Sequence, residues 1–260
     1  MAGKTYVAQS ITATLEDLGR YFVFLWEIVR SVPKKPSRLV QCLAEIERLG
    51  VQSVPIIFLS GVAIGMILVL QLITFLRPFQ AEIGAGAFVA IILAQELAPL
   101  ITTLMLIAKN GSAMAAELGT MKITEQIDAL ESMSVDVVHY LVLPKVVACL
   151  FVFPVLTLLA NVVGSMGAYI VAVFIFAIDS AGYVDYTLSI LRPIDVKVGL
   201  VKSTVMGFIT ATICCFNGLR TTQGAAGVGD STTRAVVVSS VSILVAAYVL
   251  NTILLPLLFA

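Results

Sequence analysis

Charged residues are scarce in this sequence. Only 12% of its 260 residues are Asp, Glu, Lys or Arg, whereas 59% are hydrophobic. Soluble domains usually carry about a quarter charged residues, so the composition excludes an ordinary soluble protein and indicates several membrane-spanning helices. The length allows roughly five or six spans of about 20 residues. The net charge is zero, which gives no electrostatic basis for binding nucleic acid.

Residues for metal binding and ATP hydrolysis are also missing. There is one histidine, and the four cysteines form no CxxC pair, so we expect no metal site and free, packed thiols. No Walker A pattern is present, and the chain is therefore not expected to be an enzyme that hydrolyses ATP. The start of the chain also lacks the pattern of a secretory signal. The cysteines are Cys42, Cys149, Cys214 and Cys215.

Five apolar runs are long enough to cross a membrane, namely 51–76, 87–108, 144–177, 198–216 and 235–260. The third run exceeds one straight crossing. Splitting it near residues 161–164 leaves two pieces that are each too short, so one tilted or kinked helix is the simpler interpretation. Gly61 and Gly65 in the first run are four residues apart, a spacing that lets another helix approach closely. The fold class is thus an all-α integral membrane protein with five spans.

The amino-terminal residues 1–50 form a separate unit ahead of a single transmembrane domain at 51–260. Residues 8–32 alternate apolar and charged positions at helical spacing, which predicts an amphipathic helix in the membrane interface. Packing against another protein domain is the alternative. Pro33 and Pro36 end this helix, and a second short helix is expected over 38–49.

The polar stretch at 111–138 stands out between the second and third spans. It predicts a cytoplasmic helix over about 114–133, with Glu125, Asp128 and Glu131 on one face. A general acid or base needs a desolvated site, and this helix has no pocket of its own, so a docking face or a solvated face is favoured over catalysis. Residues 179–197 are expected to form a polar outer loop, and 217–234 a glycine-rich loop.

Basic residues predict the orientation. Five spans place twelve of the 16 Lys and Arg residues on the side that holds the amino terminus and the stretch 111–138. The positive-inside rule then puts that side in the cytoplasm and the carboxy terminus outside.

Glu96 is the main candidate site residue within a span. A carboxylate in the bilayer costs roughly 2.5–3.5 kcal/mol, so it should face protein or a water-filled cavity. Two interpretations stay open: a contact to a substrate head group, or a structural hydrogen bond to a neighbouring helix. Lys202, near the outer end of the fourth span, is expected to reach the interface along its aliphatic stem.

Several blocks of sequence resemble the MlaE (YrbE) family, the permeases of ABC lipid transporters that work with MCE proteins. The matching blocks are 60–66 (SGVAIGM), 95–99 (QELAP), 111–113 (GSA), 116–121 (AELGTM), 125–130 (EQIDAL), 135–136 (VD), Pro144 and 232–237 (TTRAVV). They occur in order, with similar spacing, from about residue 45 onward. Such a series is specific to this family.

The resemblance implies a homodimeric permease in a bacterial inner membrane, with a carboxy terminus in the periplasm. Its implied partners are cytoplasmic ATPase subunits, which would bind ATP and magnesium, and a periplasmic MCE protein; this chain itself would hold no cofactor. The implied cargo is a phospholipid, and the implied role is lipid transport between the inner and outer membranes, which maintains outer-membrane lipid asymmetry. The implied lipid contacts are Leu68, Phe75, Leu76, Phe79, Gln95, Glu96 and Leu97, and the implied ATPase-coupling residues are Glu117, Gly119, Met121, Glu125, Gln126 and Asp128.

Two positions depart from the family pattern. Many members carry a basic residue where this chain has Gln95, so the charge pair beside Glu96 is expected to be lost. The basic residue before Gly111 is shifted by one position, to Lys109. Two other functions stay open from the sequence: an ion-coupled secondary carrier that uses Glu96, for which no internal repeat is found, and a membrane scaffold without transport activity.

Overall fold

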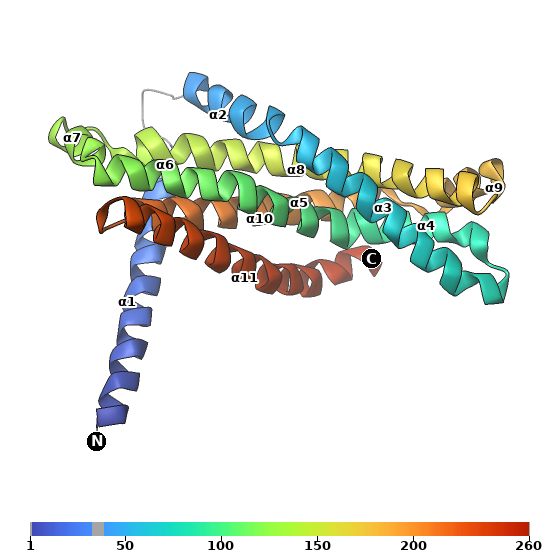
Figure 1. The fold of residues 1–260 in the computed structure, drawn as a ribbon, viewed down its shortest axis with the longest axis horizontal. Coiled ribbons are helices and arrows are strands. Elements are labelled where there is room, and N and C mark those ends of the chain that lie inside the picture. Colours follow the sequence, from blue (N-terminus) through green and yellow to red (C-terminus); the bar gives the residue numbers. More distant parts are fainter. Residues whose placement is uncertain (1, 33–38, 260) are drawn as a thin grey trace.

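The computed structural model describes residues 2–32 and 39–259, and every regular element in these ranges is helical. Five helices are long and apolar enough to cross a membrane: Val54–Phe79, Glu82–Ile123, Val138–Ile175, Pro193–Leu219 and Gly224–Leu254. They run lengthwise in an elongated bundle (Figure 1). The protein is an all-α integral membrane protein, and the predicted number of spans is confirmed, including the single helix over the long third run.

Each span is assembled from elements that follow one another directly. The first is α3 (Val54–Leu76), continued by η1 (Arg77–Phe79). The second joins η2 (Glu82–Gly84), α4 (Ala85–Ile92), η3 (Leu93–Leu97), α5 (Ala98–Leu106), η4 (Ile107–Gly111) and α6 (Ser112–Ile123). The third joins η5 (Val138–Val142), α8 (Leu143–Ile170) and η6 (Val171–Ile175), and the last two are α10 (Pro193–Leu219) and α11 (Gly224–Phe259). Four of the short elements, η3, η4, η5 and η6, are π-helical turns, a feature often found at functional sites.

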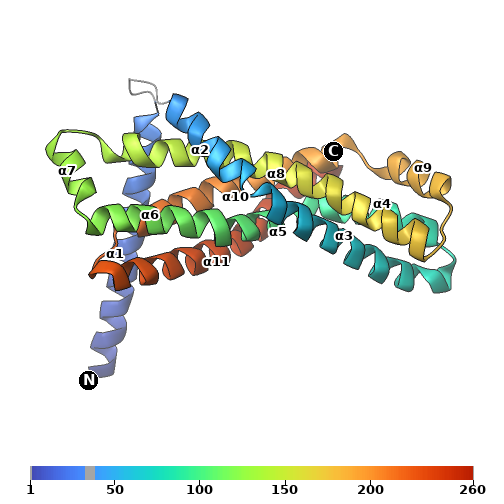
Figure 2. The ribbon, with the colours of Figure 1, turned by 45° about the horizontal axis from the view of Figure 1, so that its top comes forward.

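The amino-terminal helix α1 (Ala2–Ser31) leaves the bundle crosswise in both views (Figures 1 and 2). It is not among the helices suited to span a membrane. Its second half packs on the bundle, where Tyr21 and Phe24 contact the Phe216 ring at centroid distances of 5.4 and 5.6 Å. The predicted helix is confirmed, and its location at the membrane surface stays a prediction. The helix α2 (Leu39–Val51) leads into α3. The predicted break at Pro33 and Pro36 lies outside the described residues.

Glycines set the closest helix contact, between α3 and α8. A Cβ atom at Gly65 would overlap the backbone carbonyl of Gly164, and one at Gly61 would lie 2.7 Å from Val163 Cγ2. The predicted close approach at Gly61 and Gly65 is therefore confirmed, because only hydrogen side chains leave room for these two backbones.

Two predicted loops are wrong. The stretch 179–197 holds α9 (Ser180–Ile190), which starts because the Asp179 carboxylate accepts a hydrogen bond from the Gly182 N–H at 2.7 Å. The glycine-rich stretch 217–234 is also mostly helical, since only residues 220–223 separate α10 from α11. Positive φ angles at Gln223 (68°) and Gly224 (65°) make the sharp turn there.

The second and third spans are longer than a bilayer requires. With 42 and 38 residues, they measure roughly 60 Å each at 1.5 Å per residue, about twice the hydrocarbon thickness. Both therefore extend beyond the hydrocarbon, and α6 and the start of α8 lie at one end of the bundle with α7 (Gln126–Ser132) (Figure 1). The prediction of a single helix over 114–133 is wrong, because two helices cover this stretch. Glu125, with a left-handed φ of 59°, breaks it into α6, which continues the second span, and the short α7.

Candidate functional site

A cluster of polar side chains joins three spans around Lys202. The ammonium group donates to Glu96 Oε1 at 2.7 Å, to the Gln95 carbonyl at 2.9 Å and to Asn251 Oδ1 at 2.6 Å. Lys202 is only 1% exposed. The prediction that this lysine reaches the outer interface is wrong, because three acceptors inside the bundle take the place of water.

Two nearby residues explain why the cluster forms at this level. A Cβ atom at Gly199 would overlap the Ala94 carbonyl oxygen, so this glycine lets α10 lie directly against the π-turn η3. Lys202, one helical turn further on, then faces η3 as well. Pro99 has no N–H with which to bond the Gln95 carbonyl four residues earlier. The Lys202 ammonium donates to that carbonyl instead.

Gln95 extends the polar cluster toward the amino-terminal end of α10. Its side-chain amide donates to Asp195 Oδ1 at 2.7 Å, and Asp195 is 1% exposed. The other carboxylate oxygen of Asp195 accepts from the Arg192 backbone N–H at 2.9 Å. Position 95 thus supplies no charge to Glu96, as expected, but Lys202 of the fourth span pairs with Glu96 instead.

The predicted lipid contacts differ in how far their side chains are exposed. Glu96 keeps 40% of its side chain exposed despite its bond to Lys202. Leu68, Leu76 and Leu97 pack on the margin of one hydrophobic core cluster. Phe75 and Phe79, whose ring centroids are 6.1 Å apart, are 68% and 70% exposed. Their contact with lipid stays a prediction.

The hairpin of α6 and α7 carries part of the predicted coupling set on its surface. Glu125, Gln126 and Asp128 are exposed, whereas Ile127 is buried and anchors α7. Lys122 at the end of α6 pairs with Asp128 at 2.6 Å and ties the two helices together. Met121 is half-buried, and Gly119 is buried against Thr221.

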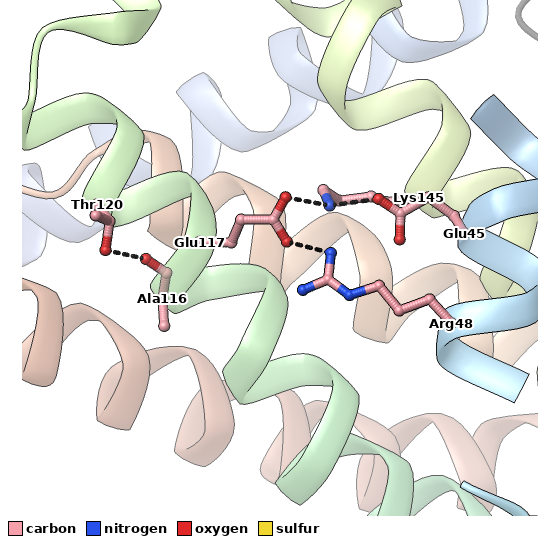
Figure 3. A network of polar contacts seen from close by, with 6 residues as sticks. All are labelled: Glu45, Arg48, Ala116, Glu117, Thr120 and Lys145. Atoms are coloured by element: carbon pink, nitrogen blue, oxygen red, sulfur yellow. Dashed lines mark hydrogen bonds and ion pairs between the residues drawn. The ribbon is translucent and has the colours of Figure 1, made fainter. Parts of the chain in front are cut away.

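Glu117, another of the predicted coupling residues, takes part in a charge network (Figure 3). It accepts from Arg48 at 2.9 Å and from Lys145 at 3.0 Å. Lys145, only 2% exposed, also pairs with Glu45 at 2.8 Å. The network joins α2, α6 and α8. This network was not predicted, although Lys145, the only charged residue in the apolar run 144–177, was the available signal.

One further contact ties α2 and α3 to the second span. Lys109 donates to the Gln52 carbonyl and to Ser53 Oγ, and Asn110 donates to the Leu49 carbonyl at 3.1 Å. The shifted basic residue therefore anchors η4 to the junction of α2 and α3. Within the described ranges, no group of three or more His, Cys, Asp or Glu residues could hold a metal ion.

Known proteins with similar sequences match almost the whole chain. The family model described as Permease MlaE matches residues 42–253. A probable ABC transporter permease protein of Rickettsia bellii is 37% identical over 91% of both chains. The intermembrane phospholipid transport system permease protein MlaE of Haemophilus influenzae is 34% identical, again over 91% of both. The chloroplastic protein trigalactosyldiacylglycerol 1 of Arabidopsis thaliana is 36% identical over 86% of this chain and 64% of its own length.

Proposed function

The chain belongs to the MlaE permease family, and we propose that it is the membrane subunit of an ATP-driven transporter that moves phospholipid between the inner and outer membranes of a bacterium. The relatives named as ABC transporter permeases, and the one named for intermembrane phospholipid transport, support this proposal. A periplasmic MCE protein would receive or supply the lipid. The working unit would be a homodimer in the inner membrane.

The observation that carries the proposal is the α6–α7 hairpin at the end of two overlong helices. Its exposed Glu125 and Asp128 offer negative charge to basic side chains of a cytoplasmic ATPase, which would bind the ATP and magnesium. Because α6 is the direct continuation of the second span, a displacement of the hairpin is transmitted along one helix to Glu96. This chain would supply no nucleotide site of its own.

Glu96 is our proposed contact for a lipid head group. Its carboxylate lies in an apolar span, where Oε1 pairs with the Lys202 ammonium at 2.7 Å. The Glu96 side chain is still 40% exposed, so it remains accessible to a ligand. Lipid chains would then lie along Leu68, Leu76, Leu97, Phe75 and Phe79 in a cavity between two protomers. The positive-inside rule supports an orientation with the hairpin and amino terminus in the cytoplasm and the carboxy terminus in the periplasm.

Charge reversal on the hairpin tests the coupling. The double variant Glu125→Lys with Asp128→Lys should lose the ATPase during purification and lose ATP-driven lipid movement, while Glu16→Lys on the exposed face of α1 should behave as the parent protein. Because position 125 has a left-handed φ, Glu125→Asn provides a neutral control that tolerates this backbone conformation. Full ATPase retention and lipid movement in the doubly reversed variant would contradict the assignment.

The same assays separate the two other functions. Lipid movement that persists without any ATPase and disappears in Glu96→Gln would identify an ion-coupled carrier. A scaffold without transport activity predicts no effect of Glu96→Ala or of a bulky residue at Gly61 or Gly65 on lipid movement.

A further inference from the structure

A groove of about 440 Å³ lies between α1, the end of α10 and the start of α11. Its walls are apolar along Leu18, Phe22 and Val238, and charged at one end, where Asp17, Arg220 and Arg234 meet. The groove shares no residue with the Lys202 cluster or with the α6–α7 hairpin. The parts of α10 and α11 that line it lie at the end of the bundle from which α1 departs (Figure 1).

The charged end of the groove has more positive than negative charge. Arg220 donates to Asp17 Oδ1 at 2.7 Å, and Arg234 donates to Asp17 Oδ2 at 3.3 Å. One carboxylate therefore faces two guanidinium groups. Each guanidinium has five N–H donors, so most of them remain for a second anion. Asp230 does not line this groove but the adjoining hollow, which Arg220 and Arg234 also line.

Both arginines can be reached by a ligand, and one is held in place. Their side chains are 37% exposed at Arg220 and 65% exposed at Arg234. The Arg220 guanidinium lies over the Phe216 ring, 5.0 Å from its centroid, which fixes its orientation. A planar guanidinium binds a phosphate by two parallel hydrogen bonds. The site is thus suited to a phosphodiester.

The apolar walls require a ligand that also has a hydrocarbon chain. Leu18 and Phe22 project from α1 with 52% and 61% of their surface exposed, and Val238 on α11 is 40% exposed. An amphipathic helix in the interface plane places such residues at the boundary between head groups and acyl chains. Basic pockets between helices at this level attract anionic lipids.

We propose that the groove binds one anionic phospholipid of the leaflet in which α1 lies, with its phosphodiester on Arg220 and Arg234 and an acyl chain along Leu18, Phe22 and Val238. This lipid is a resident ligand that fastens α1 to α10 and α11, and it is distinct from the transported lipid proposed at Glu96. The leaflet is the cytoplasmic one if the orientation in the proposed function is correct. Asp17 competes with the phosphate for the two arginines.

Native mass spectrometry of the purified protein in detergent tests the site. Phosphatidylglycerol and phosphatidylcholine with the same acyl chains are added at equal concentration, and the retained lipid is counted. Phosphatidylglycerol should be preferred, and Arg220→Gln and Arg234→Gln should each weaken its retention roughly fivefold. Val238→Trp, which fills the groove without changing its charge, should reduce retention as well. Arg20→Gln, an exposed arginine of α1 outside the groove, is the matched control and should change nothing.

Asp17→Asn distinguishes a lipid site from a purely structural ion pair. It removes the competing carboxylate, so retention of phosphatidylglycerol should rise; no rise would mean that the arginines serve only to hold Asp17, and would overturn the proposal. Equal retention of the two lipids by the parent protein would overturn it too. Glycerophosphoglycerol, the head group without acyl chains, should not compete; if it does, the site takes a small anion and not a lipid.

The outcome is separable from that of the proposed function. Glu96→Gln should leave the preference for phosphatidylglycerol at the groove intact. If the parent protein retains this lipid through the two arginines but moves no phospholipid with ATP, the resident site stands and the transport assignment fails.

Discussion

Lys202 lies in an apolar helix, yet each of its three ammonium donors has an acceptor. One acceptor is a charge, one is a backbone carbonyl that Pro99 leaves without its usual helical donor, and one is an amide on the last span. A lone lysine at this depth would cost several kcal/mol, so the cluster holds the second, fourth and fifth spans in one arrangement. Any movement between these spans must exchange these bonds for others.

The first prediction concerns this lysine. Lys202→Met should lower stability by roughly 2–3 kcal/mol, less than for a fully buried pair because Glu96 is partly exposed. The double variant with Glu96→Met should recover most of that loss, since replacing both charges is often nearly neutral. Thermal unfolding in detergent measures both, with the exposed Lys197→Met on the same helix as control. If the single and the double variant lose the same stability, the ion pair between Lys202 and Glu96 does not contribute to the stability of the protein.

A second prediction compares two glycines. Gly65→Ala should destabilise the protein because the new methyl group overlaps the Gly164 carbonyl. Gly229→Ala in α11 has open space around its Cβ position and should stabilise the helix by up to about 1 kcal/mol. Chemical or thermal unfolding should therefore show a loss of stability for Gly65→Ala and a gain for Gly229→Ala. A gain for both variants would contradict the close contact of α3 with α8.

At the scale of elements, the charge network at Lys145 connects α2 and α8 with α6 (Figure 3). Glu117 therefore joins the helix that carries the hairpin to the helix that precedes the first span. Under the proposed function, a force on the hairpin would reach the first span through this network and the second span through the continuous helix.

The third prediction removes the centre of that network. Lys145→Met leaves Glu117 and Glu45 without their buried partner and should cost roughly 2–4 kcal/mol of stability. Lys122→Met breaks the more exposed pair with Asp128 and should cost less than about 1 kcal/mol. Unfolding midpoints in detergent give the comparison. A loss at Lys122 as large as that at Lys145 would show that burial is not the deciding factor.

The fourth prediction concerns the attachment of α1 and its pH dependence. The hydrogen bond from Arg220 lowers the pKa of Asp17 below its ordinary value of 3.8. Because the folded pKa is the lower one, the contribution of Asp17 to stability is complete above about pH 5 and is lost as the pH falls through the folded value. The melting temperatures of the parent protein and Asp17→Asn should differ near neutral pH and converge in acid. A difference that stays constant with pH would contradict the ion pair.

For the molecule as a whole, hydropathy predicted the five spans because each of these helices is long and apolar enough to cross a membrane. The two false loops arose from composition: Asp, Tyr and Gly lowered the hydropathy at 179–197 and 217–234, although Asp179 caps a helix and the glycines lie within one. The break between α6 and α7 at Glu125 could not be predicted from periodicity. The left-handed backbone of Glu125 leaves no mark on the spacing of acidic and apolar residues in the sequence.

The site was predictable only in part, for a physical reason. Glu96 was conspicuous as a carboxylate in an apolar run, and the hairpin as a polar stretch between spans. The partner of Glu96 is more than a hundred positions away in sequence, and Lys202 alone resembles a residue near the interface. Glu117 likewise resembled its neighbours on the acidic surface, because nothing local indicates that Arg48 and Lys145 approach it.

The most direct test of the proposed transport is lipid movement by the reconstituted complex. The chain would be purified from native membranes with its co-purifying ATPase and placed in vesicles with a fluorescent phospholipid and acceptor MCE protein. We expect transfer that requires ATP hydrolysis and is lost in the Glu125→Lys, Asp128→Lys variant. Transfer at the same rate without the ATPase, or in that variant, would contradict it.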